Sequence, residues 1–228
     1  MNLLAIDTSS VACTVAVSVA DVIVERHEEQ AREHTQLLMP MIRAALEESG
    51  ISLTDLDAIV LGNGPGSFIG MRIAASVSQG LAHGADLRII PVSSLAAVAA
   101  EVMDKSEARI VAVAQDAHLH EVYLGIFRRQ DSGLPEAIID ERLQRQTLIE
   151  ELSPADAAAT IAAGQGWQRY PQLAAVNGAS LAEFSNVLYP RASYLLRLAD
   201  LSNAVQPKDI APAYLRQKVA EKPRPSKS

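Results

Sequence analysis

The sequence has little cysteine, no long apolar run and no excess of basic charge. One cysteine in 228 residues cannot form an internal disulfide, so a secreted domain held together by disulfides is excluded. No stretch approaches the roughly 18 uninterrupted apolar residues of a membrane span, and the N-terminus lacks the pattern of a signal peptide. The formal charge of −7 is opposite in sign to that of a dedicated nucleic-acid-binding protein. We therefore expect a cytoplasmic protein without membrane association.

Apolar side chains are abundant instead. Hydrophobic residues make up 49% of the chain, enough to offset the conformational entropy lost on folding, and this excludes a disordered chain. A length of 228 residues allows one large domain or two of roughly 100 residues each. In the second case each half has a core of marginal size and depends on the other half or on a partner.

Strands alternate with helices through the first half of the chain. A short apolar stretch at 3–6 ends at Asp7, and alternating apolar residues at 11–19 place Cys13 on a buried strand face. The pattern predicts further strands at 22–25, 58–61 and 88–91 and helices at 35–49, 68–83 and 94–103. Hairpins followed by strand–helix alternation predict an α/β fold with a mixed sheet.

The opening pattern recurs after Arg109. An apolar strand ends at Asp116, a polar turn follows, and 121–127 alternates as a second strand. The repeat predicts two lobes, 1–108 and 109–205, with 206–228 packing back on the first lobe. Within the second lobe we also predict a strand at 138–143, a helix at 147–152, a strand at 160–163 and a helix at 192–201.

Asp7, Thr8 and Ser9 are the candidate cofactor-binding residues. An aspartate at a strand end, followed by small hydroxyl residues, can hold hydrated Mg²⁺ while turn amides face a phosphate. The alternative is a turn in which the aspartate binds its own backbone. His118 and His120 would share a strand face with Asp116, but no fourth ligand is evident, and we predict a hairpin tip there and no metal site.

A glycine-rich run at 62–67 precedes the helix at 68–83. It matches neither a Walker loop nor a dinucleotide fingerprint. Either the amides at the helix start meet an anion, or the glycines allow two backbones to approach closely.

Two apolar helices are candidates for an interface with another chain. In the helix at 68–83, a stripe of small residues lies beside a stripe of large ones, and the helix at 35–49 has one broad apolar face. Burial within one subunit and contact with a partner are both consistent with this pattern. The candidate interface residues are Leu38, Met41, Ile42, Ala45, Ile69, Gly70, Ile73, Ala74, Val77 and Ser78.

Charge is unevenly distributed along the chain. Residues 206–228 contain six basic and two acidic residues, so the remainder is more acidic than the whole. Such a segment is either a solvated terminus or a segment that faces an anion.

Several motifs resemble the TsaB (YeaZ) family, namely residues 6–9, 32–36, 62–73, 116–123 and 213–216. The resemblance spans nearly the whole chain, is strongest up to Val92 and is thin between 130 and 189. It implies an actin-like (ASKHA, ribonuclease H-like) fold with two lobes, each a mixed sheet flanked by helices. It also implies a role in making N6-threonylcarbamoyladenosine in tRNA, next to the anticodon, as a non-catalytic partner of TsaD, with TsaE as the third member.

The resemblance further implies that the chain holds no catalytic metal. TsaD-like enzymes carry a His-x-x-x-His pair at the start of the helix that follows a strand like 88–91, whereas this chain reads Ser93-Ser94-Leu95-Ala96-Ala97-Val98. We expect no tightly bound cofactor, with nucleotide only at an interface with TsaD and TsaE. We expect tRNA to be reached through the complex, and a homodimer when TsaD is absent. The alternative is an actin-like phosphotransferase or metallopeptidase, although only Asn177-Gly178 is available as an adenosine-binding loop.

Overall fold

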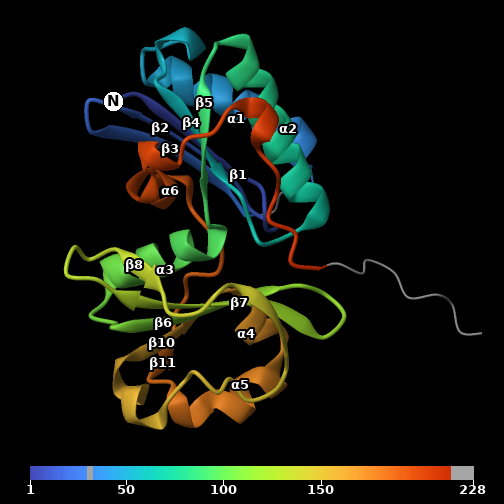
Figure 1. The fold of residues 1–228 in the computed structure, drawn as a ribbon, viewed down its shortest axis with the longest axis vertical. Helices are drawn as coiled ribbons and strands as arrows, with labels where there is room; N and C mark the ends of the chain where they lie inside the picture. The colour runs from blue at the N-terminus through green and yellow to red at the C-terminus, as the bar shows by residue number, and fades with distance from the viewer. Residues whose placement is uncertain (30–32, 217–228) are drawn as a thin grey trace, which may run out of the picture.

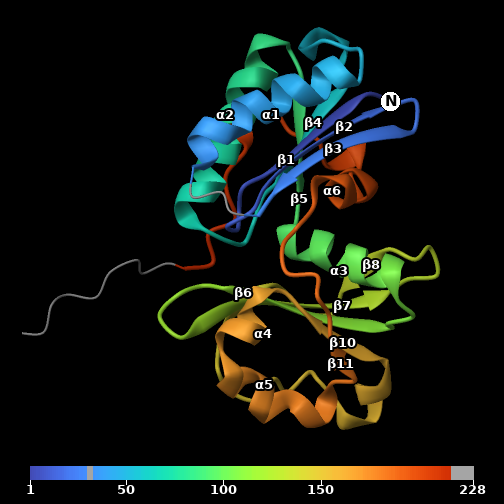
Figure 2. The same cartoon turned by 180° about the vertical axis from the view of Figure 1, so that it is seen from behind.

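The computed structural model describes residues 1–29 and 33–216, which form two lobes stacked along the long axis of the molecule (Figures 1 and 2). Each lobe is built on one mixed sheet with helices on both faces. The predicted α/β class with two mixed sheets is therefore confirmed. Among the described residues, no helix has both the length and the apolar character needed to cross a membrane.

The first sheet has the strand order β3-β2-β1-β4-β5. The strands β1 (Leu3–Asp7), β2 (Cys13–Val19) and β3 (Val22–Glu28) are antiparallel neighbours. The strands β4 (Ala58–Gly62) and β5 (Arg88–Val92) run parallel to β1. The short 3₁₀ turn η1 (Leu53–Asp55) leads into β4. The predicted positions of these strands hold to within a few residues.

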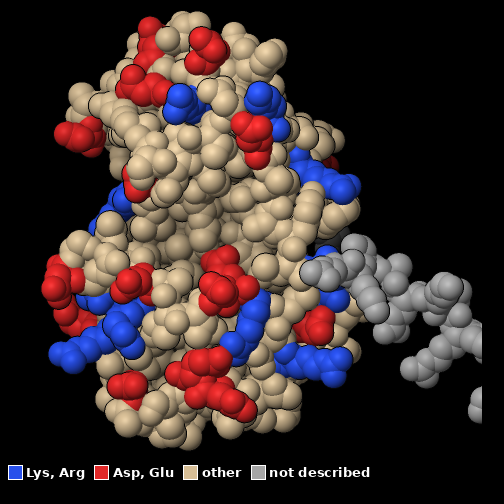
Figure 3. Space-filling model, viewed as in Figure 1, with Lys and Arg blue, Asp and Glu red and all other residues tan. Residues whose placement is uncertain are grey.

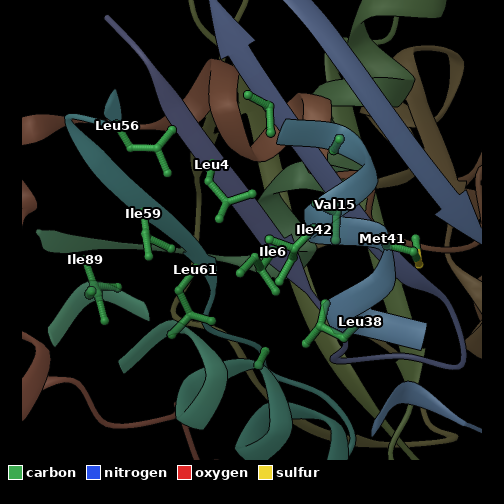
Figure 4. Close-up of a cluster of buried hydrophobic side chains, with 14 of the residues drawn as sticks. Leu4, Ile6, Val15, Leu38, Met41, Ile42, Leu56, Ile59, Leu61 and Ile89 are labelled. Atoms are coloured by element: carbon green, nitrogen blue, oxygen red, sulfur yellow. The ribbon is translucent and has the colours of Figure 1, made fainter. Parts of the chain in front are cut away.

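Helices cover both faces of this sheet. On one face, α1 (His34–Glu48) and α2 (Phe68–Gly84) pack against side chains of β1, β2, β4 and β5 to form the core drawn in Figure 4. On the other face, α6 (Ala192–Leu198) packs against the alternate side chains of the same strands. The Cys13 thiol is fully buried, as predicted, and burial, followed by the charges of Asp7 and Glu28, raises its pKa to about 12.

The second sheet has the order β11-β10-β6-β7-β8, with β9 also paired to β7. The hairpin of β6 (Ile110–Asp116) and β7 (Glu121–Arg129) forms its centre. The helix α3 (Ser94–Lys105) covers one face, and α4 (Gln165–Arg169) and α5 (Pro171–Asn177) cover the other. The remaining strands are β8 (Pro135–Ala137), β9 (Arg142–Arg145), β10 (Thr160–Ala163) and β11 (Glu183–Phe184).

Two predictions for the second lobe are wrong. Two short strands, β8 and β9, replace the single strand predicted at 138–143, and the segment 147–152 is not a helix. The Asn177 side chain explains the second error, because its Oδ1 accepts a hydrogen bond from the Ile149 amide and its Nδ2 donates to the Thr147 carbonyl. The backbone of this segment is thus satisfied by a side chain from α5, and Ile149 and Leu152 are buried without a helix. The 3₁₀ segments η2 (Pro154–Ala159) and η3 (Gly178–Ser180) complete this part of the chain.

The lobes exchange one helix each. The helix α3, predicted within the first lobe, buries Leu95 and Val98 against the second sheet. The helix α6, predicted within the second lobe, buries Leu195 against the first sheet. Boundaries at 108 and 205 therefore separate each helix from the sheet it covers, and this corrects the sequence-based division. Both helices lie between the two sheets and are in contact with each other (Figure 1).

The last described segment, 204–216, contacts both lobes. Val205 pairs with Ile89 of β5, and Ile210 is buried in the first-lobe core; the 3₁₀ turns η4 (Leu201–Asn203) and η5 (Pro207–Asp209) flank Val205. Leu215 then packs against the core of the second lobe, and Arg216 donates to the Ala117 carbonyl. The remainder of the basic segment predicted at 206–228 lies outside the described residues.

Candidate functional site

Asp7 lies at the end of β1, fully buried, and both of its carboxylate oxygens are engaged. Oδ2 accepts a hydrogen bond of 2.5 Å from the Ser94 hydroxyl, and Oδ1 accepts one of 2.6 Å from the Ser9 amide. Burial raises the pKa of Asp7 to about 6, although these hydrogen bonds act in the opposite direction. The carboxyl therefore links β1 to the start of α3 rather than facing solvent.

The turn after Asp7 packs directly on the glycine run and on α2. The Thr8 hydroxyl donates to the Gly70 carbonyl at 2.7 Å, and the Ser67 amide donates to the Ser9 carbonyl at 2.6 Å. A Cβ atom at Gly66 would lie 2.1 Å from the Ser9 carbonyl oxygen. Of the two interpretations of the glycine run, the close approach of two backbones is the one confirmed.

These contacts correct the assignment of Asp7, Thr8 and Ser9 as candidate cofactor-binding residues. The side-chain oxygens of Asp7 and Thr8 are buried and bonded within the chain, and Ser9 is 4% exposed. A Cβ at Gly62 would lie 1.9 Å from Asp7 Oδ2, so the space beside the carboxylate is filled by the chain's own backbone. These contacts do not test the expectation that no cofactor is bound tightly anywhere in the chain, which stays a prediction.

Substitution of two glycines of α2 tests this close packing. A Cβ at Gly70 would lie 1.9 Å from the Thr8 carbonyl oxygen, whereas a Cβ at Gly80 would meet nothing within 4 Å. Gly70→Ala is expected to destabilise the protein by about 1–3 kcal/mol through overpacking. Gly80→Ala is expected to stabilise it by up to about 1 kcal/mol through helix propensity. Urea denaturation of both variants checks the opposite signs, and equal effects would contradict the packing argument.

The start of α3 is the position at which TsaD-like enzymes are expected to carry two histidines. Here Ser93 caps the helix by accepting a hydrogen bond from the Ala96 amide, and its hydroxyl donates to Glu141. Burial raises the pKa of Glu141 to about 7, against the effect of this hydrogen bond. Ser94 accepts from the Gly64 amide and donates to Asp7. Both serines therefore hold the helix against neighbouring segments.

The hairpin between β6 and β7 brings Asp116 and His118 together as predicted, with Tyr170 beside them. The Tyr170 hydroxyl donates to Asp116 Oδ1 at 2.6 Å, and His118 Nδ1 lies 3.2 Å from Oδ2. His118, Leu119 and His120 all have positive φ, which is typical of a tight hairpin tip. Within 1–29 and 33–216, no three His, Cys, Asp or Glu side chains gather as metal ligands.

Most of the candidate interface side chains are buried inside this chain. They are less than 9% exposed, because they fill the space between the first sheet and its two helices, and they leave almost no area for a partner. The prediction is corrected for Leu38, Met41, Ile42, Ala45, Gly70, Ala74 and Ser78. Ile69 is 69% exposed, and Ile73 and Val77 are partly exposed on the same side of α2.

An aromatic cluster extends this exposed ridge at the start of α2. The Arg72 guanidinium lies 3.7 Å from the centre of the Phe68 ring, and its Nε donates to the Tyr214 hydroxyl at 3.0 Å. The Phe68 and Tyr214 rings are 5.3 Å apart. We define the α2 patch as Phe68, Ile69, Arg72, Ile73, Val77 and Tyr214. Sequence reasoning missed Tyr214 as a member, since it joins the patch from 142 residues beyond Arg72.

Comparison with known proteins agrees with this architecture. The family TsaD, described as tRNA N6-adenosine threonylcarbamoyltransferase, matches residues 20–223. The Escherichia coli tRNA threonylcarbamoyladenosine biosynthesis protein TsaB is 37% identical, with all of both chains covered. The Haemophilus influenzae TsaB is 35% identical over all of this chain and 98% of its own.

Comparison with solved structures indicates the same family. A Pseudomonas aeruginosa protein described as similar to peptidase YEAZ superposes with a TM-score of 0.84 at 35% identity, covering 94% of this chain and 99% of that one. YeaZ from Pseudomonas aeruginosa superposes with a TM-score of 0.83 at 33% identity, with the same coverage. The two-lobed actin-like fold is thereby confirmed, and the chain belongs to the TsaB (YeaZ) family.

Proposed function

We propose that this chain acts in the biosynthesis of threonylcarbamoyladenosine in tRNA as a non-catalytic partner of TsaD, together with TsaE. The observation that carries the proposal is the end-to-end match to proteins named for this pathway. The α2 patch supports binding to a partner, because it combines an exposed isoleucine with an arginine and two aromatic rings. Aromatic and arginine side chains are enriched among the residues that dominate binding energy at protein interfaces.

The chemistry at the start of α3 supports the non-catalytic part of the proposal. The stretch Ser93–Val98, where the resemblance implies a His-x-x-x-His pair, contains no histidine, and neither serine in it is a strong metal ligand. Asp7 is buried and bonded to Ser94, so it does not offer a carboxylate to a nucleotide-bound Mg²⁺. The same patch on α2 would serve a homodimer when TsaD is absent, and nucleotide would bind only at the interface with TsaD and TsaE.

Reconstitution from purified components tests this proposal. Unmodified tRNA, threonylcarbamoyl-adenylate, ATP and Mg²⁺ are incubated with this chain, TsaD and TsaE from the same organism, and each protein is left out in turn. We expect modified tRNA only when TsaD and this chain are both present, and no ATP hydrolysis by this chain alone. ATP turnover by the isolated chain would instead favour the alternative, an actin-like phosphotransferase. Modification of tRNA without TsaD would contradict the non-catalytic role. Peptide hydrolysis by the isolated chain would favour a metallopeptidase.

A further inference from the structure

The last six described residues, 211–216, connect the α2 patch to the second lobe, and we call them the strap. In Figure 1 the C-terminal part of the described chain, drawn in red, runs beside α2 and then toward the second lobe. The strap forms neither a helix nor a strand. Its position therefore depends on its contacts with the two lobes.

The first half of the strap is attached to the glycine run of the first lobe. Asn63 Nδ2 donates a hydrogen bond of 3.1 Å to the Ala211 carbonyl, and the Ala213 amide donates one of 3.2 Å to the Asn63 carbonyl. Pro212 lies between these two bonds, and its ring fixes its own φ and favours extended backbone at Ala211. The chain therefore approaches Tyr214 in a defined direction.

The second half of the strap is attached to the hairpin of β6 and β7. Leu215 packs against the second-lobe core, which includes Ala117 and Tyr123. The Arg216 guanidinium donates to the Ala117 carbonyl at 2.9 Å and lies 2.7 Å from the Glu121 carboxylate. The Arg216 and Glu121 side chains are only 18% and 22% exposed, so solvent screens this ion pair less than a surface pair. Figure 3 shows basic and acidic side chains next to one another on the second lobe, near the end of the described chain.

Tyr214 lies between these two attachments and is the member of the α2 patch that the strap supplies. Its hydroxyl accepts a hydrogen bond from Arg72, and its ring packs on Phe68, but 42% of the residue is exposed. Two residues of extended chain span at most about 7 Å. Tyr214 therefore cannot move far from the patch while Arg216 stays bound to the hairpin, and it is held from one side alone when Arg216 is released.

We propose that Leu215 and Arg216 are positioning residues that hold Tyr214 in the α2 patch, so that the second lobe takes part in partner binding. The inference rests on the proposed function, which makes TsaD the partner at this patch. Arg216 acts through Tyr214 and not through a contact with TsaD. An aromatic ring that is already held in place loses less conformational entropy when a partner binds, and it therefore contributes more to the affinity.

Arg216→Gln tests this inference, and Arg145→Gln is the matched control. Arg145 lies 3.8 Å from Glu121 and its side chain is 83% exposed, so both variants remove one positive charge beside the same carboxylate. Arg145, however, lies outside the strap. Calorimetric titration with TsaD should show binding about tenfold weaker for Arg216→Gln, comparable to the cost of ordering one residue again, and unchanged for Arg145→Gln. Equal affinities of the wild type and Arg216→Gln would overturn the inference.

A double-mutant cycle with Tyr214→Ala determines whether Arg216 acts through Tyr214. Once the ring is absent, Arg216→Gln should cause no further loss of affinity for TsaD, because the effects of coupled residues do not add. A general structural role of Arg216, or its direct contact with TsaD, would give the same loss with and without the ring. That result would contradict the assignment of Arg216 as a positioning residue.

Hydrogen exchange of the isolated chain separates this inference from the proposed function. The Ala213 amide, which bonds to the Asn63 carbonyl, should exchange faster in Arg216→Gln than in the wild type or Arg145→Gln, while the amides of α2 keep their rates. Unchanged exchange at Ala213 would overturn the inference even if TsaD binds. If the wild-type chain does not bind TsaD but Ala213 responds as expected, the proposed function is wrong and the positioning of Tyr214 by Arg216 stands.

Discussion

Replacing Ala74 with glutamate is expected to lower the free energy of unfolding by about 3–5 kcal/mol, the usual cost of an uncompensated buried charge. Ala74 is fully buried between α2 and the first sheet, in the cluster that also holds Leu61 and Ile42. The longer side chain would add overpacking to the electrostatic cost. Because small domains are stable by only about 5–15 kcal/mol, much of the Ala74→Glu protein would unfold near physiological temperature.

Ser76→Glu is the control for this variant. Ser76 lies two residues further along α2 and is exposed, so the same charge on the same helix should change the stability by less than about 0.5 kcal/mol. Thermal and urea unfolding of both variants give the comparison. A stable Ala74→Glu protein that has lost only its affinity for TsaD would show that this side of α2 faces a partner and not the core.

The sequence left this choice open because the periodicity of α2 does not distinguish the two environments. A stripe of Gly70, Ala74 and Ser78 is flat in either case, and flat stripes pack closely against a sheet as well as against another helix. The structure shows that the stripe faces its own chain, because the Thr8 turn packs on Gly70 in a long-range contact. Local spacing carries no information about a contact across 62 residues.

The strands and helices of the first lobe could be predicted because their patterns are long and periodic. β2 alternates over seven residues, and α2 has a serine cap at Ser67. In the second lobe, β8, β9 and β11 are four residues long or less, too short for a period to emerge. The segment near Ile149 is held by the Asn177 side chain, a tertiary contact that overrides local propensity. The exchange of α3 and α6 between the lobes could not be predicted either, because it depends on which sheet each helix packs against and not on the sequence of the helix itself.

Asp7 was identified as a special position, but its role could not be predicted. A strand-terminal aspartate suits both a phosphate site and a structural turn, and the partner that decides between them is Ser94, 87 residues away. The α2 patch could not be predicted for the same reason. Tyr214 contacts Phe68 and Arg72 only because the segment 204–216 follows a path that brings it to the start of α2. Residue types and motifs could therefore be recognised, whereas their contacts could not.

Ile69→Glu is expected to weaken binding to TsaD more than a hundredfold and to leave the fold intact. The Ile69 side chain is 69% exposed at the start of α2, so a charge there is solvated in the isolated protein and its melting temperature should not change. In the complex the same charge would be buried without a partner, at a cost of about 3–5 kcal/mol. Calorimetric titration with TsaD measures the affinity, and the reconstituted reaction should lose activity in parallel.

Leu148→Glu separates this effect from a general response to added charge. Leu148 is 60% exposed, close to Ile69 in accessibility, but it lies in the second lobe and outside the α2 patch. The control variant should bind TsaD with wild-type affinity and support modification. Because both substitutions add one negative charge to the same acidic chain, long-range repulsion would weaken both, whereas burial at an interface weakens only Ile69→Glu. Wild-type affinity of a folded Ile69→Glu protein would exclude the α2 patch as the binding surface.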